Sequence, residues 1–124
     1  MLDILKYLHE RNIIYKDLKL SHIFVEKESM NVKLIDFGMT EELDEYKTTS
    51  RPGGTYHCMS PEMASLFISR LKNEEPDYKN LPSFSSDIWT LGIFAIELVF
   101  KMKLLPFKHF NGTDKSNEQK IEYL

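Results

Sequence analysis

Several features that would assign a protein to a special class are missing from this 124-residue sequence. It has one cysteine, Cys58, so no disulfide can form within the chain, and we expect a small buried or half-buried side chain in a reducing compartment. Charges interrupt the apolar positions of residues 1–12, which therefore lack the uninterrupted apolar segment of a secretory signal. The longest apolar stretch, residues 88–100, is interrupted by Glu97 and is shorter than the roughly 20 residues that a membrane span needs. We therefore predict a cytoplasmic or nuclear protein that has no membrane partner.

The sequence also lacks a large excess of charge of one sign. Its 16 lysine and arginine residues stand against 19 aspartate and glutamate residues, for a net charge of −3, and no basic cluster stands out. A nucleic-acid partner is therefore not expected. Hydrophobic residues make up 42% and charged residues 28% of the chain, which is ordinary for a soluble globular domain. The length fits one domain or part of one.

Hydrophobic spacing predicts an α+β fold that is mainly helical. Apolar positions at helical spacing predict a helix over residues 2–12, and a similar pattern predicts another helix over residues 62–71. Residues 23–25 and 32–35 are short β-type runs, and the polar connection between them is typical of a hairpin.

Two longer stretches between these elements lack periodicity. Residues 36–58 predict a long loop, of a length that is usually functional or disordered inside a compact domain. Residues 72–86 predict an irregular segment, after which Asp87 is expected to begin a buried helix, with Ser85 or Ser86 as its N-cap. The polar tail of the chain ends in KIEYL, which predicts the start of a further helix.

Charged and titratable side chains flank the two predicted strands. Asp17, Lys19 and His22 precede the first strand, and Asp36 follows the second. Because hairpin strands lie about 5 Å apart, the end of the second strand returns beside the start of the first, which places Asp36 near the other three. A carboxylate that accepts a hydroxyl proton, another that holds a cation and a lysine that neutralises phosphate charge suit phosphoryl transfer.

Five short segments then give a family resemblance. The segment YKDLKLSH is similar to the catalytic-loop pattern H-R-D-L-K-x-x-N of eukaryotic protein kinases, and DFG matches their metal-binding motif. Three later segments resemble the end of the activation segment, the start of the helix that anchors the catalytic loop, and the turn after that helix. The five segments occupy residues 15–22, 36–38, 54–62, 87–92 and 105–107. Lys19 and Thr55 resemble the serine/threonine type of kinase.

The resemblance implies a partial large (C-terminal) lobe over residues 1–124. Its parts are a catalytic loop at 15–22, an activation segment at 36–62, a surface insertion of unknown role at 70–84 and an anchoring helix at 87–101. No G-x-G-x-x-G loop and no V-A-I-K-type strand lysine occur, so the small lobe is absent from this sequence. We expect negligible kinase activity from the chain alone.

Site residues are implied one at a time by the same resemblance. Asp17 matches the residue that accepts the proton of a protein hydroxyl, Lys19 contacts the transferring phosphate, and Thr55 helps hold both. Asp36 matches the ligand of the Mg²⁺ that accompanies ATP, and Phe24 falls beneath the adenine ring. The expected partner is a protein substrate.

Three positions depart from the family pattern. Tyr15 replaces a histidine, Lys16 replaces an arginine that binds an activation-segment phosphate, and His22 replaces an asparagine that ligates a second metal ion. Imidazole nitrogen suits zinc, copper, iron or nickel better than magnesium, so His22 casts doubt on the two-metal arrangement. Two alternatives describe the role of His22. It forms a new transition-metal site with Asp36, or it is a loop histidine hydrogen-bonded to the backbone. The candidate regulatory phosphosites are Thr48, Thr49 and Ser50.

The resemblance also bears on the helices. Asp87 matches an aspartate that hydrogen-bonds the catalytic-loop backbone, and the core residues of its helix are predicted to be Trp89, Phe94 and Leu98. Glu62 resembles a glutamate whose arginine partner lies far downstream, and no residue after 107 matches that partner.

Three hypotheses for the whole chain follow. It is a fragment of a serine/threonine kinase, a pseudokinase lobe that scaffolds a protein partner, or an unrelated small helical domain. Exposed apolar faces of residues 2–12 and 88–100 are expected to favour self-association.

Overall fold

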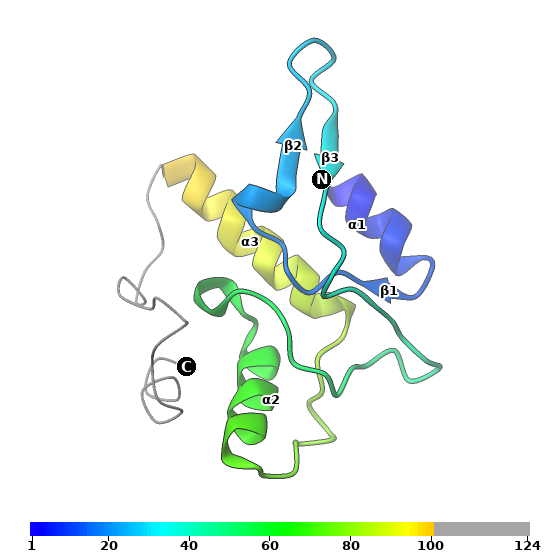
Figure 1. Ribbon diagram of the computed structural model, residues 1–124, viewed down its shortest axis with the longest axis vertical. Helices are drawn as coiled ribbons and strands as arrows, with labels where there is room; N and C mark the ends of the chain where they lie inside the picture. Colours follow the sequence, from blue (N-terminus) through cyan, green and yellow to red (C-terminus); the bar gives the residue numbers. More distant parts are fainter. Residues whose placement is uncertain (101–124) are drawn as a thin grey trace.

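The computed structural model describes residues 1–100, so the predicted turn at 105–107, the predicted terminal helix and residue 101 of the predicted anchoring helix lie outside the described residues. The described residues form three α-helices, two short antiparallel strand pairs and two 3₁₀ turns (Figure 1). In chain order these are α1 (Leu2–His9), β1 (Ile13–Ile14), η1 (Leu20–His22), β2 (Ile23–Val25), β3 (Val32–Leu34), β4 (Glu41–Glu42), η2 (Tyr56–Cys58), α2 (Pro61–Lys72) and α3 (Phe84–Phe100). This confirms an α+β arrangement.

The predicted hairpin is confirmed. Strands β2 and β3 pair antiparallel with Ile23 opposite Leu34 and Val25 opposite Val32, and the hairpin projects from one end of the molecule (Figure 1). The second pair, β1 with β4, places Ile14 opposite Glu41 and was not predicted. It arises because part of the predicted 36–58 loop extends alongside the residues that follow α1.

The helices begin and end at local signals. Helix α1 ends at His9 rather than near residue 12, because the chain turns through Asn12, whose φ is 58°, before entering β1. Helix α2 agrees with its prediction to within one residue. The hydroxyl of Ser60 accepts the Met63 amide at 3.3 Å as an N-cap, and Asn73 ends α2 in the left-handed conformation.

The predicted start of the third helix was wrong. Helix α3 begins at Phe84, so the predicted caps and Asp87 lie within its first turns, and the Ser86 amide already donates to the Ser83 carbonyl at 3.0 Å. The irregular segment is correspondingly shorter than predicted and covers residues 73–83, since α2 reaches residue 72. Its last residues contact the long loop, where the Thr49 amide donates to the Pro82 carbonyl at 2.8 Å.

The core lies between α1, the 15–22 loop and β3. Its buried members are Leu5, Leu8, Tyr15, Leu18 and Leu34, and Leu91 of α3 packs against them. Burying a large aliphatic side chain contributes about 1.5–3 kcal/mol, so this cluster holds α1 and the loop together.

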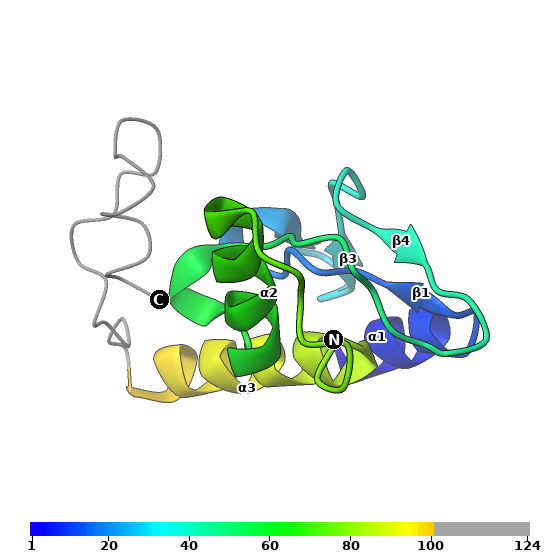
Figure 2. The same ribbon diagram turned by 90° about the horizontal axis from the view of Figure 1, so that it is seen from below.

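Helix α3 is less buried than predicted. Figure 2 shows it running along one side of the described chain, with α1 near its N-terminal end and α2 on its other flank. Within residues 1–100, its buried side chains are Ser86, Asp87 and Thr90, whereas Trp89 is 46% exposed and Leu98 is 55% exposed. The prediction that these two are core residues was wrong, because the described elements cover one face of α3 only. None of the described helices has the length and apolarity that crossing a membrane requires.

Candidate functional site

The loop at residues 15–22 is held to α3 by one buried carboxylate. Asp87 is 1% exposed, and its Oδ1 accepts the Lys16 amide at 2.8 Å. Its Oδ2 accepts the Tyr15 amide and the Nε2–H of His9, both at 2.8 Å. These bonds satisfy backbone amides where Lys16 adopts a φ of 69°, an uncommon conformation for a residue with a side chain. The loop therefore depends on Asp87 for its shape.

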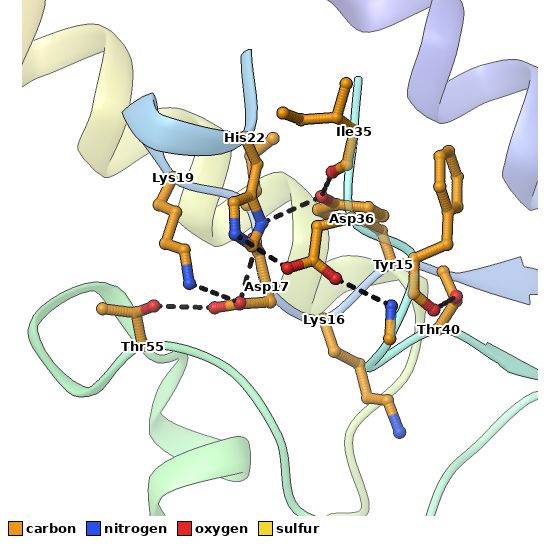
Figure 3. Close-up of polar contacts among 12 residues, drawn as sticks. Tyr15, Lys16, Asp17, Lys19, His22, Ile35, Asp36, Thr40 and Thr55 are labelled. Carbon is orange, nitrogen blue, oxygen red and sulfur yellow. Dashed lines mark hydrogen bonds and ion pairs between the residues drawn. The ribbon is translucent and has the colours of Figure 1, made fainter. Parts of the chain in front are cut away.

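The side chain of Asp17 joins this loop to the segment after β4 (Figure 3). The Thr55 hydroxyl donates to its Oδ1 at 2.7 Å, and the Lys19 ammonium donates to its Oδ2 at 2.7 Å. Asp17 is 8% exposed, so both carboxylate oxygens are committed to protein donors. Three predicted site residues thus lie in direct contact.

Gly54 allows Thr55 to reach Asp17. Its φ is +100°, and a Cβ at this position would lie 2.5 Å from the backbone carbonyl oxygen of Lys16. A side chain here meets both backbone strain and a carbonyl that cannot move without the 15–22 loop. Glycine is therefore required at the point where the two segments cross.

We expect Gly54→Ala to lower the free energy of unfolding by about 2 kcal/mol or more, because the strain and the carbonyl clash add. Urea unfolding followed by circular dichroism measures this change. The matched control is Gly92→Ala on α3, where an added Cβ meets no atom within 4 Å and stability should stay level or rise. Equal stability of Gly54→Ala and the wild type would contradict the requirement.

Asp36 and His22 face each other across the loop and the hairpin (Figure 3). The Nε2 of His22 lies 3.4 Å from the Oδ2 of Asp36, and the Nδ1 of His22 lies 3.0 Å from the Asp17 carbonyl oxygen. The Asp36 side chain is 59% exposed, whereas the His22 side chain is 9% exposed. The structure thus brings Asp17, Lys19, His22 and Asp36 into one cluster, as the hairpin argument expects.

The donor set fits a hard cation only in part. The exposed carboxylate of Asp36 fits Mg²⁺, which takes one or two protein carboxylates together with water and phosphate oxygens. His22 offers a nitrogen instead of an amide oxygen and does not fit Mg²⁺ as a ligand. Across residues 1–100, no three His, Cys, Asp or Glu side chains gather closely enough to hold an ion by themselves.

Phe24 occupies the first strand of the hairpin. Its side chain is among the exposed large apolar groups, with 56% of the residue accessible. An exposed ring at this position is free to stack on a flat ligand, and its role beneath an adenine ring stays a prediction.

A buried ion pair that the sequence did not reveal lies beside the cluster. The Lys16 ammonium donates to Glu41 Oε2 at 2.8 Å, with the two side chains 5% and 18% exposed. The Thr49 hydroxyl donates to the same oxygen at 2.5 Å, and Arg51 Nε lies 3.8 Å from Glu41 Oε1. The β1–β4 pairing creates this contact, and no periodicity in the loop signals it.

The ion pair changes how the three candidate phosphosites are placed. Thr49 is 1% exposed and its hydroxyl donates to Glu41, so this hydroxyl is buried in the described structure. Thr48 is half-buried and bridges to Ser83, whereas Ser50 is exposed. Regulation at these positions stays a prediction.

Two further titratable groups near the site are accounted for. Burial, reinforced by the charges of Asp17 and Glu97, raises the pKa of the Cys58 thiol to about 12. The thiol is therefore protonated at neutral pH, and the side chain is 6% exposed, as predicted for a small buried group. Glu62 also has a partner within the described chain, because the Ser86 hydroxyl donates to its Oε1 at 2.7 Å.

Comparison with known proteins places these residues in a family. The model of the protein kinase domain matches residues 1–123. A relative named "Probable serine/threonine-protein kinase mkcF" from Dictyostelium discoideum is 34% identical over 122 residues, which cover 92% of this chain and 16% of that protein. Mitogen-activated protein kinase kinase kinase 1a of Physcomitrium patens is 35% identical over 94 residues, covering 76% of this chain and 11% of that protein.

A third relative is named as a protein kinase C. The eye isozyme of protein kinase C from Drosophila melanogaster is 38% identical over 94 residues, which are 75% of this chain and 11% of that protein. The chain therefore spans between 11% and 16% of the length of these curated relatives.

Proposed function

We propose that this chain, which belongs to the protein kinase domain family, supplies the catalytic loop and the cation-binding carboxylate for ATP-dependent phosphoryl transfer to protein serine or threonine. The observation that carries the proposal is the Asp17 carboxylate, held 2.7 Å from both the Thr55 hydroxyl and the Lys19 ammonium. This geometry fixes a base and a cation at adjacent positions. Positioned groups of this kind are what phosphoryl transfer needs from a protein.

Each of these side chains has a distinct chemical task in the proposal. Asp17 orients a substrate hydroxyl and accepts its proton as the hydroxyl oxygen attacks phosphorus. Lys19 turns from Asp17 toward the transferred phosphoryl group and neutralises part of its negative charge. Thr55 keeps Asp17 in place while Lys19 moves, and Asp36 holds the cation. ATP supplies the phosphoryl group when bound.

The proposal treats the 124 residues as one part of a kinase domain. They contain no glycine-rich phosphate loop and no strand lysine, so the chain by itself would hold one side of a nucleotide. We therefore propose weak nucleotide binding and negligible phosphoryl transfer for the isolated chain.

A scaffolding role is the second candidate, and a specific observation favours it. His22 stands where the family has a metal-binding asparagine, and its ring is buried with Nδ1 bound to the Asp17 carbonyl oxygen. The exposed apolar side chains of α3 offer a surface for a protein partner, among them Leu98, Val99 and Phe100. In this role the catalytic-loop geometry serves the fold rather than a reaction.

A nucleotide titration tests the proposed function. Because a ligand that binds only the folded state raises its melting temperature, millimolar ATP with Mg²⁺ should stabilise the chain, and Asp36→Asn should remove the response. Asp44→Asn is the matched control, because both exposed carboxylates accept the amide two residues later, at 3.1 Å for Asp36 and 3.0 Å for Asp44.

The same samples are assayed for phosphate incorporation into a generic protein substrate. Unchanged melting at millimolar ATP would count against the catalytic proposal and favour the scaffold. Incorporation that disappears in Asp17→Asn would overturn the claim that the isolated chain is inactive.

A further inference from the structure

The hydrogen bonds around His22 determine which ring nitrogen carries a hydrogen. Its Nδ1 lies 3.0 Å from the Asp17 carbonyl oxygen, which can only accept, and 3.1 Å from the Tyr15 hydroxyl oxygen. The Tyr15 hydroxyl donates its own hydrogen to the Ile35 carbonyl oxygen at 2.5 Å. Both neighbours of Nδ1 therefore accept from it, and Nδ1 is the donor. In the neutral form of the ring, the lone pair therefore lies on Nε2.

The same contacts aim Nε2 at Asp36. Both backbone polar groups of Ile35 are hydrogen-bonded. Its amide donates to the His22 carbonyl at 2.9 Å, and its carbonyl accepts from the Tyr15 hydroxyl. Asp36 follows directly with a φ of 62°, so its side chain leaves the strand in a set direction. The result is the 3.4 Å separation between Nε2 and the Asp36 Oδ2.

This separation suits two ligands of one ion. Zinc–nitrogen and zinc–oxygen bonds of about 2.0–2.2 Å at a tetrahedral angle place the two donor atoms about 3.3–3.6 Å apart. A ring whose other nitrogen donates to a backbone carbonyl is also the usual state of a metal-binding histidine. The His22 side chain is 9% exposed and the Asp36 side chain is 59% exposed, so the carboxylate is the solvent-facing member of the pair.

We propose that His22 Nε2 and the Asp36 carboxylate form a two-ligand site for a first-row divalent cation such as Zn²⁺ in preference to Mg²⁺. Water or phosphate oxygens complete the coordination. Tyr15 is a positioning residue, because it accepts from Nδ1 and holds the Ile35 carbonyl. The inference deepens the proposed function and rests on it in one respect, because the phosphate oxygens near the cation would come from bound ATP. The cation site itself can be measured without nucleotide.

Two of the three departures from the family pattern, Tyr15 and His22, then have one explanation. They contact each other through the hydroxyl and Nδ1, and their rings meet edge to face with centroids 6.4 Å apart. A phenylalanine at 15 would leave the Ile35 carbonyl without its donor and would leave Nδ1 with one acceptor instead of two. Together, Tyr15 and His22 place a nitrogen ligand at position 22, where the family pattern has an oxygen ligand.

The test follows the histidine ring nitrogens of the full chain by ¹H–¹⁵N NMR while Zn²⁺ or Mg²⁺ is added without nucleotide. The His22 signals are identified by their loss in His22→Asn. We expect Zn²⁺ to shift the His22 Nε2 signal, Mg²⁺ to leave it in place, and Asp36→Asn to weaken the Zn²⁺ response. Tyr15→Phe should lower the Zn²⁺ affinity by about tenfold or more, the usual effect of losing an outer-shell partner.

His57→Asn is the matched control, because this histidine is exposed on η2 and its loss should leave the Zn²⁺ response of His22 unchanged. Asp36→Asn keeps the test valid if His22→Asn fails to fold, since the Asp36 side chain is 59% exposed. A His22 Nε2 signal that does not respond to Zn²⁺ would overturn the inference.

The nucleotide titration distinguishes a failure of the proposed cation preference from a failure of the proposed function. Stabilisation by Mg²⁺ and ATP without any Zn²⁺ response at His22 overturns the cation preference and leaves the proposed function standing. A Zn²⁺ response at His22 without nucleotide binding supports the cation site and counts against the proposed function.

Discussion

The Asp87→Asn variant should lose about 3 kcal/mol of its free energy of unfolding, because one buried carboxylate accepts three hydrogen bonds and serves as the anchor of the 15–22 loop. An asparagine keeps the shape but turns an NH₂ group toward at least one N–H donor. That donor is then buried without an acceptor. A small domain has only about 5–15 kcal/mol of stability in total, so the loss is a large share.

Urea unfolding monitored by circular dichroism measures the Asp87 effect. The control is Asp3→Asn, an exposed carboxylate in the first turn of α1, which should change stability by about 0.5 kcal/mol or less. Backbone amide exchange gives a second, local readout, because the amides of Tyr15 and Lys16 should lose protection first. A variant as stable as Asp3→Asn would show that the loop holds its shape without Asp87.

The Glu41→Gln variant should lose a comparable amount, about 3–5 kcal/mol, because it leaves the Lys16 ammonium buried without a countercharge. That side chain is 5% exposed, and its stem lies so close to Gly53 that a Cβ added there would be 3.4 Å from the Lys16 Cδ. The ammonium therefore cannot reach water without moving the segment that carries Thr55. Thermal and urea unfolding both measure the loss.

A double-mutant cycle separates the ion pair from the packing around it. Lys16→Met removes the charge and keeps an apolar stem, and it should cost less than Glu41→Gln because Glu41 retains the Thr49 hydroxyl. The double variant should then be more stable than Glu41→Gln alone. Additive losses from the two substitutions would mean that the pair is not coupled.

The ion pair also predicts how stability depends on pH. Burial raises the pKa of Glu41, but hydrogen bonds from Lys16 and Thr49, together with the charges of Lys16 and Arg51, outweigh it, so the net pKa lies below the ordinary 4.5. A carboxyl group with a lowered folded-state pKa stabilises the fold above its unfolded pKa and loses that contribution as pH falls through the folded value.

The stability difference between wild type and Glu41→Gln should therefore be constant near neutral pH and shrink once the pH drops below about 4.5. Urea titrations of both proteins from pH 7 to pH 3 measure it, and the subtraction removes the other carboxylates that the two chains share. A difference that grows on acidification would contradict the sign of the shift.

Local pattern was enough to predict the elements whose signals lie within a few residues. Apolar spacing predicts α2 to within one residue at each end, and the two β-type runs with their polar link predict the hairpin. The placement of Asp36 near Asp17, Lys19 and His22 followed from the hairpin, because antiparallel pairing brings the ends of adjacent strands together. The same reasoning is wrong for the start of α3, where the serine-rich stretch predicts a cap but forms the first turn of the helix.

Contacts between distant segments were beyond that reasoning. Glu41 and Lys16 are 25 residues apart, and nothing in the loop sequence marks Glu41 as the partner of a buried lysine. The burial of Thr49 and the exposure of Trp89 likewise depend on what each side chain packs against. Hydrophobicity predicts which side chains favour burial, whereas the packing of the surrounding elements determines which of those side chains are covered.

The sequence by itself determined the family and the identity of the chemical groups, because the motifs around Asp17 and Asp36 are contiguous and carry their own spacing. Only the tertiary structure decided how those groups are held. The tautomer of His22 depends on a Tyr15 hydroxyl and a backbone carbonyl, and the anchor of the loop comes from Asp87, 70 positions after Asp17. Hydrogen bonds and ion pairs are set by distance and direction in space, which a linear pattern does not contain.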